Sequence, residues 1–213
     1  MRKVLELGGF VAAAVLIAFG VAAIAMGVNG RTTVRDSLKL EQITGSPDMT
    51  KAAIAEEAMK AGLPASIKLP TADIAGKPIV TGQLAREFAS YMRIHTLEAS
   101  GGLTYAQMPR YLTADGKGTS DATKALQANG KPVDNPVRAL WVTETALTTA
   151  LNTSYMAEKV ALFGIVVGIA LLLSGIGFGV LAVGGTLRNA DPAFKLFGEK
   201  TPKTAGTSPV PTA

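Results

Sequence analysis

Two long stretches without a charged residue dominate this chain, Leu7 to Gly30 and Val160 to Leu187. As α-helices rising about 1.5 Å per residue they would extend roughly 36 and 42 Å, whereas the hydrocarbon core of a bilayer is about 30 Å thick. Both stretches are apolar around the whole helix, although a surface helix of a soluble domain keeps a polar face. The pattern predicts a mainly α-helical protein with transmembrane helices at residues 7–30 and 160–185.

The first stretch also resembles a secretory signal peptide, because Arg2 and Lys3 precede it and Ala23-Ile24-Ala25 is a passable cleavage site. A signal peptide has an apolar core of only about 7 to 15 residues, however, and this stretch is longer. A buried core helix is the other alternative, which the presence of a second such stretch disfavours. We therefore favour an uncleaved anchor over a cleaved signal peptide.

The positions of the basic residues predict the orientation, since the cytoplasmic flanks of membrane spans carry an excess of Lys and Arg. Basic residues lie at both ends of the chain: Arg2, Lys3, Arg188, Lys195, Lys200 and Lys203. Arg31, Arg35 and Lys39 follow the first span and weaken its local signal. We predict a cell-membrane protein with both termini cytoplasmic: residues 1–6, and a largely disordered tail at 186–213 that is rich in Pro, Thr and Ser. Residues 31–159 then form an extracytoplasmic domain.

The formal net charge of +5 could suggest a nucleic-acid partner, which would need a concentrated basic patch. Between Asn29 and Glu158, however, basic and acidic residues are interspersed in nearly equal numbers. The surplus lies at the membrane flanks, where basic residues favour anionic headgroups. The charge distribution therefore predicts a lipid bilayer as partner and no nucleic acid.

The segment between the spans reads as largely helical. Helices are predicted at Met49 to Ala61, with Asp48 as cap, and at Gln83 to Ser100, which has one apolar face. Asp134-Asn135-Pro136 is a start signal for a helix that continues into the second span. The pattern also allows a small β-hairpin built from residues 66–70 and 79–80, and a short helix at residues 120–128 in a turn-rich, ligand-facing stretch from 103 to 131.

Small residues recur in both spans at a spacing that allows close helix packing: Gly164, Gly168, Gly175, Gly179, Ala14, Ala18 and Ala22. We expect these residues to pack the two spans against each other, and association between copies of the chain is the alternative. Neither span contains an ionisable residue, which argues against a channel, pump or transporter.

The chemistry open to the chain is limited, because His95 is its only histidine and it has no cysteine. The common triad for non-haem iron needs two His and a carboxylate, and catalytic zinc usually draws on two or more His or Cys. We therefore predict no catalytic residue, metal site or cofactor. The side chains favoured for a ligand- or partner-facing pocket are apolar and aromatic, with core packing as their alternative role: Tyr105, Met108, Tyr111 and Trp141.

Three segments carry a resemblance to a known family: residues 5–34 (LELGGFVAAAVLIAFGVAAIAMGVNGRTTV), 89–119 (ASYMRIHTLEASGGLTYAQMPRYLTADGKGT) and 141–173 (WVTETALTTALNTSYMAEKVALFGIVVGIALLL). Outside the tail, the chain resembles a family of two-span actinobacterial membrane proteins often labelled aromatic ring-opening dioxygenase, small-subunit type. That label implies iron-dependent cleavage of a catechol-like ring. A single His95 cannot supply the iron ligands of that chemistry, so the label supports at most a companion subunit.

Two hypotheses about function follow from the sequence. The first is a non-catalytic cell-envelope membrane protein whose outer helical domain binds a ligand or a protein partner, with self-association through the small residues as a further expectation. The second is an enzyme, or a non-catalytic companion subunit of a ring-opening dioxygenase, as the family label implies.

Overall fold

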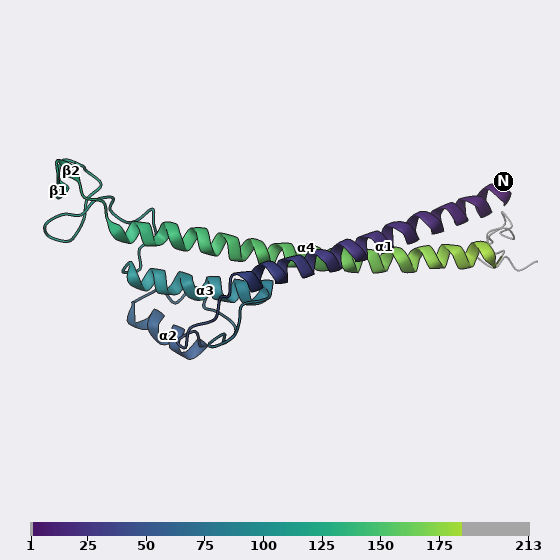
Figure 1. Cartoon of the computed structure of the whole chain (residues 1–213), viewed down its shortest axis with the longest axis horizontal. Coiled ribbons are helices and arrows are strands. Elements are labelled where there is room, and N and C mark those ends of the chain that lie inside the picture. The colour runs from purple at the N-terminus through teal and green to yellow at the C-terminus, as the bar shows by residue number, and fades with distance from the viewer. Residues whose placement is uncertain (1, 185–213) are drawn as a thin grey trace, which may run out of the picture. The chain divides into compact units, whose positions relative to one another are not determined.

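The computed structural model describes residues 2–184 and is mainly helical (Figure 1), with 63% of these described residues in helices. Its elements, in chain order, are α1 (Arg2–Leu40), α2 (Lys51–Lys60), α3 (Gly82–Ala99), β1 (Gln127–Ala128), β2 (Lys131–Pro132) and α4 (Pro136–Val183). The predicted fold class is therefore confirmed. The predicted tail at 186–213 lies outside the described residues.

The helices α1 and α4, 39 and 48 residues long, are each apolar and long enough to cross a membrane. Only 17% of the most apolar window of the first helix and 11% of that of the second are buried. Large apolar side chains such as Phe19 and Val180 are about two-thirds exposed, at 66% and 65%. A core helix of a soluble protein would be mostly buried, so these helices match the two spans expected from the sequence.

The described chain falls into two compact units. One contains α1 up to Gly20 and α4 from Ala170, and the other contains Val21 to Ile169. In the first unit, Gly175 of α4 lies against Ala13 and Ile17 of α1. In the second, Gly27 of α1 lies against Ala161 of α4. The two helices are antiparallel in each unit.

The core of the second unit forms where α3 packs against α2 and α4. The apolar face of α3 includes Ala85, Phe88, Ala89, Tyr91 and Ile94. These residues pack with residues from α1, α2, α4 and the loops: Leu38, Met49, Ile54, Ala58, Ile74, Ile79 and Leu151. This is the predicted helix in nearly its predicted bounds, and Thr81 caps it by accepting a hydrogen bond from the Leu84 N–H at 3.3 Å.

The cap of α2 differs from the prediction, which placed Asp48 there. Thr50 is the capping residue, and its hydroxyl accepts from the Ala53 N–H at 3.2 Å. The Asp48 carboxylate accepts instead from the Ser46 hydroxyl, which holds the pKa of Asp48 below its usual value against the opposing effect of burial. Ser, Thr, Asp and Asn are all good capping residues, so residue type alone does not decide whether Asp48 or Thr50 caps α2.

Residues 66–80 do not form the hairpin allowed by the sequence, because the Ile67 N–H donates to the Pro64 carbonyl and the Ile79 N–H donates to the Ile43 carbonyl, each at 2.9 Å. Glu87 accepts from the Thr71 N–H at 2.8 Å, from the Thr71 hydroxyl at 2.6 Å and from the Ala72 N–H at 3.4 Å. The Tyr91 hydroxyl donates to the Ala72 carbonyl at 3.1 Å. Glu87 thus satisfies the backbone donors of Thr71 and Ala72, which lie between the two predicted strands, and holds them against α3.

The hairpin that does exist joins β1 and β2 through Asn129 and Gly130, whose φ angles are +53° and +72°. Positive φ at both central residues defines a turn for which Asn-Gly is the preferred sequence. This hairpin occupies part of the region where a short helix was predicted at residues 120–128, and no helix forms there. The Asn-Gly signal was present in the sequence and favours this result.

Glu158 of α4 joins three helices at the base of the second unit. Its Oε2 accepts from the Gly82 N–H at 2.6 Å, and its Oε1 accepts from the Nη2 atoms of Arg31 and Arg35, each at 3.3 Å. Burial by itself would raise the pKa of Glu158, but the Gly82 N–H and the two guanidinium groups outweigh it and hold the pKa below its usual value. We call these four residues the Glu158 node.

Candidate functional site

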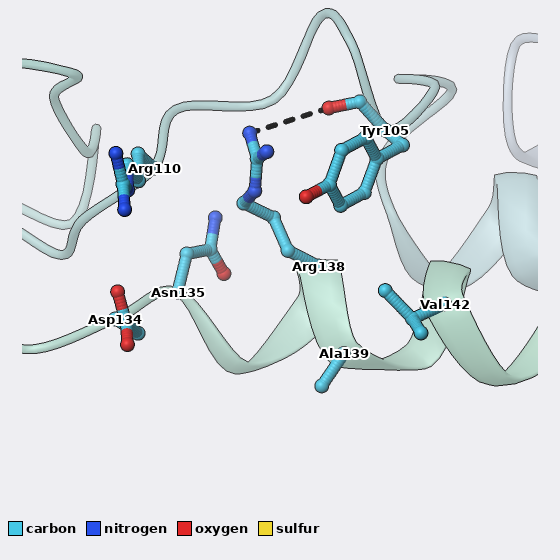
Figure 2. Close-up of a pocket in the computed structure, with 7 residues that line it drawn as sticks. All are labelled: Tyr105, Arg110, Asp134, Asn135, Arg138, Ala139 and Val142. Carbon is cyan, nitrogen blue, oxygen red and sulfur yellow. Dashed lines mark hydrogen bonds between the residues drawn. The ribbon is translucent and has the colours of Figure 1, made fainter.

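A polar cavity of about 530 Å³ lies at the amino-terminal end of α4 (Figure 2). We call it the α4 pocket. Its lining combines two guanidinium groups, a carboxylate, an amide and a tyrosine ring with two apolar side chains: Tyr105, Arg110, Asp134, Asn135, Arg138, Ala139 and Val142. The volume lies in the range of small-molecule sites, about 300 to 1,000 Å³.

Asn135 builds the pocket by fixing the start of α4. Its Oδ1 accepts from the Val137 N–H at 3.1 Å, which caps the helix, while its Nδ2 donates to the Pro109 carbonyl at 3.1 Å. The Asn135 N–H also donates to the Arg110 carbonyl at 2.9 Å. The predicted helix start at Asn135-Pro136 therefore also holds the Pro109–Arg110 segment beside the helix.

Arg138 forms the wall of the pocket opposite this segment. Its guanidinium lies 3.9 Å from the centre of the Tyr105 ring, and its Nη1 donates to the Tyr105 carbonyl at 3.3 Å (Figure 2). The same Nη1 also donates to the Met108 carbonyl at 2.9 Å. Arg110 extends from the facing loop, where its guanidinium lies 5.3 Å from the Tyr111 ring centre. Two positive charges face the single negative charge of Asp134, so the pocket favours an anionic group.

The four side chains predicted to face a ligand or partner, those of Tyr105, Met108, Tyr111 and Trp141, lie in different environments. Tyr105 lines the α4 pocket. Met108 and Trp141 are buried, at 4% and 3% exposure, in a small core with Leu97, and the Trp141 indole N–H donates to the Leu103 carbonyl at 3.0 Å. Tyr111 is bridged through its backbone to Thr119 and Asp134. A ligand-facing role for Tyr105 stays a prediction, while core packing, the stated alternative, is the observed environment of Met108 and Trp141.

Sequence reasoning missed the polar lining of the pocket, namely Arg110, Asp134, Asn135 and Arg138. Asp134 and Asn135 were recognised only as a helix start signal. Arg138 lies within the first turn of that helix, where a side chain faces the preceding loop. The capping signal at Asn135 therefore marks the helix start beside which the pocket lies. It does not show which residues Arg110 and Arg138 contact, because those contacts depend on how residues 103–135 fold.

The glycines predicted to pack the spans lie in or beside helix contacts. Gly168 and Gly175 are buried, and a Cβ atom at Gly175 would lie 2.8 Å from Ile17 Cγ1 and 2.9 Å from the Ile17 nitrogen. A Cβ at Gly164 or Gly179 would make ordinary contacts at 3.8 Å, with the Ala23 carbonyl and with Ala13 Cβ.

The packing face of α1 differs from the predicted one, since Ala14, Ala18 and Ala22 are all exposed. The buried small residues of this helix are Gly9, Ala13, Gly20 and Gly27. Residues spaced strictly by four drift about 40° per step around a helix with 3.6 residues per turn. Spacings that average close to 3.5 residues keep one face toward a neighbouring helix. The buried residues recur at spacings of four and seven, so they remain in contact with α4.

The only histidine, His95, is half-buried between α2 and α3. Its Nδ1 lies 2.8 Å from Glu57 Oε1, and its Nε2 lies 3.9 Å from Asp48 Oδ2. Across residues 2–184, no group of three His, Cys, Asp or Glu side chains is arranged to hold a metal ion. The observed role of His95 is to link α2 to α3.

Searches with this chain found no matching family model, no matching curated protein and no matching solved structure. Geometry and charge are therefore the only basis on which a function can be assigned.

Proposed function

We propose that the chain is a non-catalytic, two-span membrane protein of the cell envelope whose outer domain binds a small polar ligand with an anionic group. The proposed spans are residues 7–30 and 160–185, with residues 31–159 outside the membrane and both termini cytoplasmic. The observation that carries the ligand proposal is the α4 pocket, a cavity of about 530 Å³ whose lining includes both Arg110 and Arg138.

The exposed apolar surfaces of α1 and α4 support membrane insertion. A soluble monomer rarely exposes an apolar patch larger than a few hundred Å², and lipid removes the cost of exposing this surface. The helix α4 is continuous from Pro136 to Val183, so Arg138, Ala139 and Val142 of the pocket belong to the same helix as the second span.

The absence of cysteine from the sequence makes the topology simple to test. Single variants Lys117→Cys, in the outer domain, and Lys3→Cys, before the first span, are labelled in intact spheroplasts with a membrane-impermeant maleimide. We expect labelling of Lys117→Cys in intact cells and of Lys3→Cys only after lysis. The reverse pattern, or recovery of the intact chain from the aqueous fraction without detergent, would overturn the membrane proposal.

Ligand binding is tested with citrate and inorganic phosphate as probes. Trp141, the only tryptophan, lies one turn beyond Arg138 and reports binding by fluorescence. Hydrogen bonds to charged groups contribute about 1.5 to 3 kcal/mol, so Arg110→Gln should weaken binding by roughly tenfold or more. Lys117→Gln, which removes the same charge outside the pocket, is the matched control. Equal binding by both variants would show that the pocket is not the site.

The non-catalytic part of the proposal is tested against the ring-cleavage alternative by measuring bound iron and catechol cleavage in the purified chain and in His95→Ala. We expect neither activity nor stoichiometric iron in either protein. Crosslinking in native membranes followed by mass spectrometry tests the two partner proposals, an envelope protein and a second copy of the chain. A second copy could associate through the exposed face that contains Ala14, Ala18 and Ala22.

A further inference from the structure

Two adjoining cavities on the paired segments of α1 and α4, of about 280 and 150 Å³, share Arg31 and Arg35 in their lining. We call them together the arginine cleft. The larger cavity is completed by Thr81, Gln83, Glu158, Lys159 and Leu162, and the smaller one by Val28, Thr32 and Ile165. All these residues belong to the second compact unit.

The cleft has a surplus of positive charge. Arg31, Arg35 and Lys159 contribute three positive charges, and Glu158 contributes one negative charge. Both arginines donate to the same oxygen, Glu158 Oε1, at 3.3 Å. Their Nε atoms are buried without an acceptor among the described residues. Since an unpaired buried donor costs about 1 to 3 kcal/mol, the two guanidinium groups are short of acceptors.

The cleft lies where both apolar stretches end. Arg31 directly follows the first stretch, and Lys159 directly precedes the second. A Cβ added at Gly27 would lie 2.6 Å from the Ala161 carbonyl, and one at Gly30 would lie 3.3 Å from Ala161 Cβ, so these chain positions lie at one level along the helix pair. In a bilayer, this is the level of the headgroups on the side of the outer domain.

The cleft is also amphipathic. Its charged residues lie on the side of the domain, whereas Val28, Leu162 and Ile165 line it within the apolar stretches. Val28 and Leu162 are 52% and 40% exposed. A soluble anion would use only the charged part, whereas a phospholipid would place its phosphate beside the arginines and its acyl chains along the apolar side chains.

We propose that the arginine cleft binds the headgroup of an anionic phospholipid in the leaflet next to the outer domain. The phosphate oxygens accept hydrogen bonds from Arg31 and Arg35, and the net charge of the cleft favours a lipid with a net negative charge over a zwitterionic one. This inference rests on the membrane insertion proposed above.

The test uses the full chain in nanodiscs of equal phosphatidylglycerol and phosphatidylcholine, released for native mass spectrometry that counts the retained lipids. We expect the wild type to retain one phosphatidylglycerol preferentially. A basic residue near an anionic surface contributes about 1 kcal/mol, or roughly fivefold in affinity. The double variant Arg31→Gln, Arg35→Gln should therefore reduce the preference roughly 30-fold, and the charge-matched control Lys117→Gln, Lys124→Gln should leave it unchanged.

A second variant distinguishes lipid binding from a loss of folding. Glu158→Gln keeps both arginines and an acceptor for the Gly82 N–H but removes the competing negative charge. We expect it to raise the preference for phosphatidylglycerol roughly fivefold, which damage to the fold would not do. Unchanged Trp141 fluorescence confirms that the variants compared are folded.

The possible outcomes separate this inference from the proposed function. Failure of the chain to enter nanodiscs would overturn the membrane proposal itself. Insertion with equal retention of the two lipids would overturn only the lipid site. Displacement of the bound lipid by millimolar inorganic phosphate would show that the cleft binds soluble anions instead.

Discussion

Replacing Glu158 by alanine should loosen the contact between α1, α3 and α4, because all three bonds of the Glu158 node end on this carboxylate. The carboxylate is only 12% exposed, and it accepts from one backbone N–H and two guanidinium groups. The substitution leaves Gly82, at the start of α3, without an acceptor for its N–H. It also leaves Arg31 and Arg35 without a counter-charge.

The expected loss of stability is the sum of a larger contribution from the Gly82 hydrogen bond and smaller contributions from the two arginine ion pairs. The Gly82 N–H bond, at 2.6 Å to a charged acceptor, contributes about 1.5 to 3 kcal/mol. The guanidinium side chains are 34% and 44% exposed, so water replaces part of their interaction, and each ion pair contributes about 0.2 to 1 kcal/mol. Glu158→Ala should therefore lower the free energy of unfolding by about 2 to 5 kcal/mol.

The assay is urea unfolding of the full chain in mild detergent, followed by Trp141 fluorescence. Trp141 is buried in the outer domain, so its emission reports the domain rather than the spans. Glu158→Gln retains an acceptor for Gly82 and should lose only about 0.5 to 2 kcal/mol. Glu56→Ala, which removes an exposed carboxylate paired with Lys60 on α2, is the control and should leave the midpoint unchanged.

Equal midpoints for the wild type and both Glu158 variants would refute the reasoning, since the node would then contribute nothing to stability. A loss in Glu158→Gln as large as that in Glu158→Ala would show that the ion pairs, and not the Gly82 bond, hold the helices together.

Three further predictions address other parts of the molecule. Because folding lowers the pKa of Glu158, the ionised carboxylate should contribute its full stabilisation of the fold above its ordinary pKa of 4.5 and lose it as the pH falls through the lower pKa of the folded state. Acid unfolding of the wild type should show this loss of stability, and acid unfolding of Glu158→Gln should lack the part due to Glu158. Gly175→Leu should destabilise the helix pair by at least about 1 to 3 kcal/mol, whereas Gly177→Leu, at an open position, should be neutral in thermal unfolding followed by circular dichroism. Arg138→Lys should cost about 1 to 2 kcal/mol in urea unfolding, because lysine cannot both stack on Tyr105 and reach two carbonyls.

Periodicity and capping signals were sufficient to predict the four helices. The apolar face of α3 repeats at helical spacing, and Asn135-Pro136 marks the start of α4 as the structure has it. Such signals are local, so they can be read without knowing which segments meet. The hairpin was misplaced because the backbone N–H of Ile79 bonds to the carbonyl of Ile43, and this contact joins residues 36 positions apart.

The candidate site was only partly predictable for the same reason. Tyr105 was predicted to face a ligand and lines the α4 pocket, but Arg110 and Arg138 become partners in that pocket only through bonds between the start of α4 and the loop before it. The exposed position of Ala14 shows a further limit. A stripe of small residues indicates that helices can approach closely, but the choice between neighbouring stripes depends on the partner helix.

The core around α3 has a consequence for how the protein is made. Leu151 and Glu158 complete contacts with α3 and α1, yet a ribosome synthesises them more than 50 residues after Ala99, the last residue of α3. The apolar surfaces of α1, α2 and α3 that pack in this core therefore stay partly uncovered until α4 has emerged from the ribosome. Nascent chains stalled before Pro136 should be sensitive to protease, and protection should follow only once the last helix has been translated and docked.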